Sequence, residues 1–173
     1  MLEPTIAPFG SWRSPIRIDD LVGDVIGLAE PWIDGADLYW LESRPSEAGR
    51  QVLVRVGADG APEDLTPAPI SVRTRVHEYG GGAWWVHDAV VYFANWDDQR
   101  LYRLEPGVAP RALTPEPQVE RGFRYADGRS SPDGLWLFVL REWHPVGGSE
   151  AHNEIVALPA DGSRRVKAIV TGR

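Results

Sequence analysis

The side chains best suited to chemistry gather in residues 73–82, which read Arg-Thr-Arg-Val-His-Glu-Tyr-Gly-Gly-Gly. The carboxylate of Glu78 can pair with an ammonium group, and the guanidinium of Arg73 or Arg75 can clamp a carboxylate. The three glycines lack a Cβ, which lets another surface approach the backbone closely. This pattern is typical of a binding loop. The residues predicted to contact a ligand are Arg75, His77, Glu78 and Tyr79.

A purely structural role for the same loop is the alternative. In that interpretation its charges pair with one another, and Tyr79 packs under the sheet that follows. The sequence leaves both interpretations open.

A second group of polar side chains follows later in the chain. Its members are Glu142, His144, Glu150, His152 and Glu154. Imidazole and carboxylate groups suit zinc, but the two histidines fall in a Pro- and Gly-containing stretch without the helical spacing that would aim them together. We therefore predict a solvated hairpin loop, with no metal and no cofactor.

No serine has the surroundings of a hydrolase nucleophile. The elbow that exposes such a serine reads Gly-x-Ser-x-Gly, and the nearest match, residues 128–132, ends in Pro132 and leads into a hairpin. Nothing in the sequence places a His base and an orienting acid beside a serine. We therefore expect no peptide hydrolysis from this chain alone.

A repeat organises the chain. Leu65-Thr66-Pro67 returns 48 residues later as Leu113-Thr114-Pro115, and the stretch 51–56 returns in the same register as 99–104. A period of this size is typical of a four-stranded propeller blade. A β-sandwich has similar strand lengths, but its strands need not repeat one marker at the same place.

Alternating apolar residues predict three hairpins. Their strands are 37–42 with 51–56, 89–94 with 100–105, and 135–140 with 154–158. Ser131-Pro132-Asp133-Gly134 predicts a tight turn into the third pair. A fourth strand of the last unit is expected at 166–170.

The resulting fold class is all-β, a partial β-propeller of about three four-stranded antiparallel blades. We expect a lead-in at 1–24, with a short helical turn after Ser14-Pro15, and then blades at about 25–67, 80–115 and 123–171. Complete propellers have about 4–8 blades, so the ring is predicted to be open.

Composition narrows the function classes. A net charge of −7 disfavours binding to nucleic acid or acidic membranes. The chain has no cysteine, which excludes disulfides and thiolate-bound metals. No secretory leader is visible after Met1, and the longest apolar run, 135–140, is far shorter than a membrane span. We therefore expect a cytoplasmic protein.

Several motifs resemble those of one peptidase family. Residues 73–82 are similar to a segment near the start of the prolyl oligopeptidase-type serine peptidases, in the acylaminoacyl-peptidase and dipeptidyl-aminopeptidase-like branch. The stretches 8–16, 124–134 and 153–156, with Arg141-Glu142, resemble that branch too. The resemblance covers essentially the whole chain.

The resemblance implies a two-part enzyme. Its N-terminal propeller caps an α/β-hydrolase domain that holds the Ser-Asp-His triad, restricts entry to small substrates and helps to bind the substrate's N-terminal end. The chain then has as partners a peptide substrate, the remaining blades and the hydrolase domain, and residues 75–79 are where contact with substrate is expected.

Other functions stay open. A stand-alone or self-assembling propeller scaffold without enzymatic activity is the main alternative to a peptidase segment. A non-peptidase propeller hydrolase or lyase lacks a recognisable acid–base constellation here. Three blades leave strand edges and sheet faces without neighbours, so we expect the fragment to self-associate.

Overall fold

The computed structural model describes residues 6–11, 13–17, 25–145 and 150–172, and these form three sheets of four strands. The first sheet contains β1 (Gly27–Asp34), β2 (Asp37–Arg44), β3 (Arg50–Val56) and β4 (Pro62–Asp64). The second contains β5 (Trp84–His87), β6 (Val90–Ala94), β7 (Leu101–Leu104) and β8 (Arg111–Ala112). The third contains β9 (Phe123–Ser130), β10 (Trp136–Trp143), β11 (His152–Pro159) and β12 (Lys167–Thr171).

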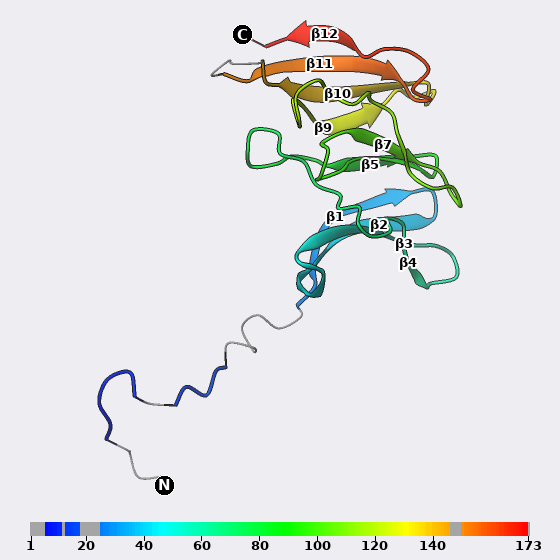
Figure 1. Ribbon diagram of the computed structural model, residues 1–173. Helices are drawn as coiled ribbons and strands as arrows, with labels where there is room; N and C mark the ends of the chain where they lie inside the picture. The colour runs from blue at the N-terminus through cyan, green and yellow to red at the C-terminus, as the bar shows by residue number, and fades with distance from the viewer. Residues whose placement is uncertain (1–5, 12, 18–24, 146–149, 173) are drawn as a thin grey trace.

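Each sheet is an antiparallel meander in which every strand pairs with the next one in sequence. The sheets stack side by side in chain order (Figure 1). The predicted all-β class, with three antiparallel four-stranded units, is confirmed. The middle sheet is covered on both faces, which a two-sheet sandwich does not provide.

The core lies in the two interfaces between neighbouring sheets. Trp84 and Trp85 are adjacent in β5 and both are buried, but they point to opposite faces because side chains alternate along a strand. Trp84 packs with Tyr39 and Phe93 between the first and second sheets. Trp85 packs between the second and third sheets. The two tryptophans thus join the three sheets.

The contact of Trp85 with the third sheet requires a glycine. A Cβ added to Gly128 would lie 2.0 Å from the Trp85 ring. The indole N–H donates a hydrogen bond of 3.1 Å to the Ser130 hydroxyl. Gly128 and Ser130 therefore give β9 the shape and the acceptor that receive Trp85.

The repeated Leu-Thr-Pro marker has a structural cause. The buried Thr66 hydroxyl accepts a hydrogen bond of 3.0 Å from the backbone N–H of Leu53, in the third strand of its sheet. In the second sheet, the Thr114 hydroxyl accepts one of 3.1 Å from the N–H of Leu101. Each threonine thus extends the ladder between the third and fourth strands beyond the end of the fourth.

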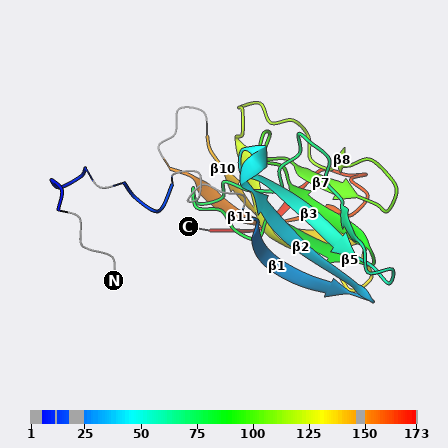
Figure 2. The ribbon, with the colours of Figure 1, turned by 90° about the horizontal axis from the view of Figure 1, so that it is seen from below.

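The outward faces of the first and third sheets expose apolar side chains. On the first sheet Leu28 is 72% exposed and Ile33 is 73% exposed; Figure 2 views the stack from this side. On the third sheet, Phe138 and Ile155 are exposed by 41% and 47%. A sheet face of this kind is suited to packing against another layer.

The lead-in differs from its prediction where the structure describes it. Residues 13–17 contain a bend, in which the Ile16 N–H donates to the Ser14 hydroxyl, and no helical turn. The rest of the interval 1–24 lies partly outside the described residues. Over the described ranges, no helix has the length and apolar character needed to cross a membrane.

Candidate functional site

The predicted binding loop lies at the end of the three sheets where neighbouring sheets are connected. Because each sheet is a meander, the β2–β3, β6–β7 and β10–β11 turns and the connections between sheets all lie at the same end. The connection from β4 to β5 contains the predicted binding loop. It is shown beside the second sheet in Figure 1.

Residues 72 and 73 of this connection pair with the backbone at the C-terminal end of β6. Val72 forms an isolated antiparallel bridge with Asn95, and the Arg73 N–H donates to the Ala94 carbonyl at 3.1 Å. Val76 is fully buried. Backbone pairing and one apolar anchor therefore fix the path of the chain as it enters the loop.

The loop then crosses to the third sheet, where Glu142 of β10 holds it. The Glu142 carboxylate accepts a hydrogen bond of 2.8 Å from the backbone N–H of His77 and lies 3.0 Å from Arg124 Nη1. His144 Nε2 lies 2.8 Å from the same carboxylate. Glu142 is only 2% exposed. These contacts satisfy the charge that its burial would otherwise leave unpaired.

Arg124 of β9 is the second residue of the third sheet that binds the loop. Its Nη1 donates to the Arg75 carbonyl at 2.9 Å and to Glu78 Oε1 at 2.6 Å. The hydrogen bond and charge of Arg124 hold the pKa of the Glu78 carboxyl below its usual range. Glu78 is therefore an anion at neutral pH, fixed at one oxygen.

His77 and Glu78 adopt left-handed backbone conformations, with φ of 56° and 63°. Such φ values are uncommon outside glycine. A hydrogen bond of 2.9 Å from the Gly80 N–H to the Val76 carbonyl closes the turn around them. The contacts with Glu142 and Arg124, together with this turn, leave the side chains of His77, Glu78 and Tyr79 directed to solvent.

The exposure of the predicted residues separates the two interpretations of the loop. Tyr79 is 98% exposed, so the expectation that it packs under the next sheet is wrong. The side chains of His77 and Glu78 are 51% and 66% exposed. The expected pairing of the loop charges with one another does not occur within residues 73–82; Glu78 pairs instead with Arg124 of β9. The backbone of the loop is thus bound to the third sheet, while the side chains of His77, Glu78 and Tyr79 face solvent.

The glycines lie against the third sheet. The Gly82 N–H donates to Asp127 Oδ1 at 2.9 Å, and the Asp127 N–H donates to the Gly82 carbonyl at 2.8 Å. A Cβ on Gly82 would lie 2.8 Å from the same carboxylate oxygen. Close approach of another backbone is therefore what this glycine provides.

Arg75 differs from His77, Glu78 and Tyr79 because its guanidinium lies over Trp96, 4.2 Å from the ring centroid. The guanidinium of Arg73 lies 4.3 Å from the same centroid. The buried Gln99 accepts the Arg75 N–H at 2.7 Å and donates to the Trp96 carbonyl at 2.8 Å. Gln99 thereby ties the loop to the β6–β7 turn.

The residues expected in a solvated hairpin loop are placed differently. Glu142 lies buried in β10, and His152 lies in β11, with its ring stacked on Trp143 at 4.5 Å. Glu154, also in β11, pairs with Arg141. The loop prediction is wrong for Glu142 and His152 because both strands extend further than the apolar pattern indicated, whereas Glu154 lies in the strand predicted at 154–158. Glu150 is exposed.

The structure brings Glu78, Glu142 and His144 together, with ligand atoms within 4.8 Å of one another. Arg124 already donates to an oxygen of each glutamate. The guanidinium is the cation of this cluster, and a metal ion would have to displace it. The cluster therefore carries no metal assignment.

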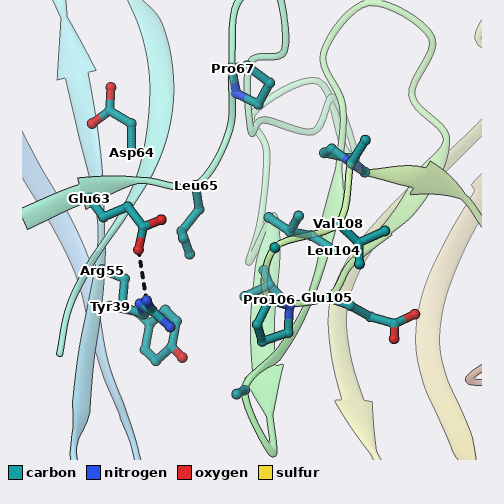
Figure 3. Close-up of a pocket in the computed structure, with 15 residues that line it drawn as sticks. Tyr39, Arg55, Glu63, Asp64, Leu65, Pro67, Leu104, Glu105, Pro106 and Val108 are labelled. Carbon is teal, nitrogen blue, oxygen red and sulfur yellow. Dashed lines mark hydrogen bonds and ion pairs between the residues drawn. The ribbon is translucent and has the colours of Figure 1, made fainter.

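A hollow between the first two sheets lies among outer strands (Figure 3). It has a volume of about 310 Å³ and is lined by apolar residues that include Leu65 and Leu104. Arg55 at its side pairs with Glu63 at 2.8 Å. It contains no nucleophile with a neighbouring base.

The serines nearest to an elbow pattern have structural roles. Ser130 lies in β9 and accepts the Trp85 indole N–H. Ser131 begins the predicted turn, in which the Gly134 N–H donates to the Ser131 carbonyl at 2.9 Å and Gly134 has φ of 68°. The turn is confirmed.

Sequence reasoning missed the residues that support the loop. Arg124 and Glu142 fall in the motifs at 124–134 and 141–142, but neither they nor Trp96 are predicted from the sequence to contact the loop. Arg124 and Glu142 occupy paired positions in neighbouring strands, so their contact follows once the register of β9 and β10 is known. Their contact with the loop has no local signal.

The chain was compared with protein-family models, curated proteins and solved structures. No family model and no curated protein matches it. Among solved structures, it is similar to a puromycin-hydrolysing peptidase of Mycobacterium tuberculosis, with 38% identity and a TM-score of 0.84 over 98% of this chain and 28% of that one. It is also similar to a puromycin hydrolase, with 36% identity and a TM-score of 0.83 over 97% of this chain and 28% of that one.

The chain thus spans about 28% of the length of these relatives. Its three sheets match part of their propeller region. The open partial propeller expected from the repeat is therefore confirmed, and the chain matches a portion of the β-propeller of serine peptidases of the prolyl oligopeptidase family.

Proposed function

We propose that this chain helps to bind and admit peptide substrate in a serine exopeptidase whose α/β-hydrolase domain lies in another part of the same protein. The similarity to puromycin-hydrolysing peptidases and the lack of a Gly-x-Ser-x-Gly elbow in the sequence support this division of labour. Within the family, we place the parent in the acylaminoacyl- or dipeptidyl-peptidase-like branch, on the motif at 73–82.

The observation that carries the proposal is the exposure of Tyr79 on a firmly held loop. Its side chain is 98% exposed, although the backbone next to it is bound to the buried Glu142. A large aromatic side chain displayed in this way supplies contact area at little conformational cost on binding. A binding surface accounts for both properties, whereas a linker needs neither.

The charge of the loop suggests which end of a peptide it contacts. Glu78 is ionised, is 66% exposed and has one oxygen bound to Arg124. Carboxylates form strong charge-assisted hydrogen bonds with ammonium groups. We therefore assign Glu78 to the free N-terminal ammonium of the substrate, with His77 and Tyr79 beside it and Arg75 behind.

Steady-state kinetics of the full-length protein that contains this chain test the proposal. Puromycin is the first substrate to try, because the relatives hydrolyse it. Glu78→Gln and Tyr79→Ala should each raise KM about tenfold and leave kcat within about twofold, since the loop binds substrate without touching the reacting bond.

Asp59→Asn is the matched control, because Asp59 is exposed in the β3–β4 turn at the opposite end of the sheets. It should leave KM unchanged. An unchanged KM in both loop variants, with intact folding by circular dichroism, would contradict the proposed role.

A self-assembling scaffold is the second candidate, favoured by the apolar faces at both ends of the stack. Leu28 and Ile33 on one face and Phe138 and Ile155 on the other are exposed. Light scattering of the isolated chain should show oligomers or aggregates. A monodisperse monomer with a cooperative thermal transition would overturn this expectation. Regular closed oligomers would favour the scaffold.

The cytoplasmic location is a further proposal, supported by the absence of cysteine from the chain. Cell fractionation with the full-length protein tests it, and recovery in the extracellular or envelope fraction would contradict it.

A further inference from the structure

Arg73 and Arg75 have an unusual environment. Their guanidinium carbons lie 4.3 and 4.2 Å from the centroid of one ring, that of Trp96. Among the described residues, no carboxylate or carbonyl accepts a hydrogen bond from either guanidinium. The Arg75 Nε is buried and has no partner. Two like charges thus share one aromatic ring, and the electrostatic interaction of Arg75 is with Glu78, which also binds Arg124.

The other arginines of the sheets and their connections, over the described range 25–145, each have an acceptor. Those in ion pairs are Arg44, Arg50, Arg55, Arg103, Arg121, Arg124 and Arg141. Those that donate to a carbonyl are Arg100, Arg111 and Arg129. The lack of an acceptor at Arg73 and Arg75 is therefore a local property of the pair.

The pair is held in place before any ligand arrives. The Trp96 N–H donates to the Ser71 carbonyl at 2.9 Å, and the Trp96 carbonyl accepts from Gln99 Nε2 at 2.8 Å. Gln99 is fully buried and also accepts the Arg75 N–H. A preorganised site of this kind loses little conformational entropy on binding.

Space for a ligand is present beside Trp96. A hollow of about 390 Å³ is lined by Arg73, Trp96, Pro69 and the segment 47–50, so it opens on the Arg73 side of the pair, and Arg75 does not line it. The acid in that segment, Glu47, is already paired with Arg44 and Arg50. No acidic side chain of the hollow is therefore left to neutralise Arg73.

We propose that Arg73 and Arg75, held on Trp96, form a binding site for the C-terminal carboxylate of a short peptide substrate. A guanidinium stacked on a ring keeps its in-plane N–H donors, whose fork matches the two oxygens of a carboxylate. This inference rests on the proposed role of the 73–82 loop in substrate binding. It adds a contact for those short peptide substrates that end in a free carboxylate, which puromycin lacks.

Binding of defined probes to the full-length protein that contains this chain, inactivated with a serine-directed inhibitor, tests the site. Isothermal titration with trialanine, trialanine amide and an amidated peptide ending in glutamate separates a terminal carboxylate from a side-chain carboxylate. We expect trialanine to bind at least tenfold more tightly than either amide. The indole N–H resonance of Trp96, assigned with Trp96→Phe, should shift only with the free acid.

Substitutions of the two arginines test whether they bind trialanine. Arg73→Gln and Arg75→Gln should each weaken trialanine binding about tenfold, and Arg75→Lys should restore part of it, which shows that the fold is intact. Arg164→Gln is the matched control, because Arg164 is exposed and lies in the β11–β12 connection at the other end of the sheets.

Three outcomes would overturn the inference. The first is equal binding of trialanine and its amide, and the second is tighter binding of the glutamate peptide than of trialanine. The third is acetate binding as tightly as trialanine at the Trp96 resonance, which would indicate an adventitious ion only. If Glu78→Gln weakens trialanine binding while Arg73→Gln and Arg75→Gln do not, this inference fails and the proposed function stands.

Discussion

The Glu142 carboxylate accepts a hydrogen bond of 2.8 Å from the backbone N–H of His77, a residue 65 positions earlier in the chain. The bond joins the connection between the first and second sheets to a strand of the third. It fixes the loop at a residue with φ of 56°. The conformation of the candidate binding loop therefore depends on a buried anion in another blade.

Glu142→Gln should lower the free energy of unfolding by about 2 kcal/mol, the usual contribution of a buried hydrogen bond to a charged group. The amide has one acceptor oxygen, so its NH₂ group must face either Arg124 or the His77 N–H. Urea denaturation at a fixed protein concentration measures the change. Glu150→Gln, at an exposed position, is the control. Equal unfolding curves for the two variants would show that Glu142 does not hold the loop.

Gly128→Ala tests the contact between the second and third sheets. The new Cβ would lie 2.0 Å from the Trp85 ring, so the ring or β9 must move. Overpacking of this kind costs about 3 kcal/mol, and we expect a matching loss of stability with a change in near-ultraviolet circular dichroism. Gly27→Ala, whose Cβ would meet Ser43 at an ordinary 3.5 Å, should have little effect. Similar stability of both variants would refute the packing account.

Thr66→Val tests why Leu-Thr-Pro recurs. Valine has a similar shape but cannot accept the Leu53 N–H, which is then buried without a partner. We expect a loss of about 1–2 kcal/mol, and the same for Thr114→Val at Leu101. Thr171→Val, on an exposed position of β12, should be neutral. No loss in either buried variant would mean that the marker has another cause.

These contacts also explain which features the sequence could predict. Thr66 and Thr114 recur because each extends the hydrogen bonding between the third and fourth strands of its sheet. The period of the blades could therefore be found from the sequence alone. The packing role of Trp84 and Trp85 follows from their residue type, because large aromatic side chains fill the space between sheets, and β5 itself shows no alternation.

Glu142 could not be found in this way. The buried Leu137 and Val139 set an inward phase along β10 that predicts Arg141 inward, yet Glu142 is the buried residue at this end of the strand. Its environment comes from Arg124 and from the 73–82 loop, which the sequence does not place beside it. The cluster of Arg73 and Arg75 on Trp96 has the same origin, because the three residues meet only through loop geometry.

The ion pair between Glu78 and Arg124 should make the free energy of unfolding depend on pH. Arg124 holds the pKa of Glu78 below its usual range, so the pair stabilises the fold above the unfolded pKa and this contribution is lost as pH falls through the folded pKa. The difference in unfolding free energy between the protein and Glu78→Gln should be constant above about pH 6 and shrink below about pH 4.3. It should stay under about 1 kcal/mol because the pair is exposed. A difference that grows on acidification would contradict the assignment.

The most direct measurement is peptide hydrolysis by the isolated chain and by the full-length protein under the same conditions, with chromogenic acyl- and dipeptidyl-substrates and a serine-directed inhibitor. We predict no turnover from residues 1–173 and inhibitor-sensitive turnover from the full-length protein. Inhibitor-sensitive turnover by the isolated chain would contradict the account, because the propeller segment would then contain a catalytic serine of its own.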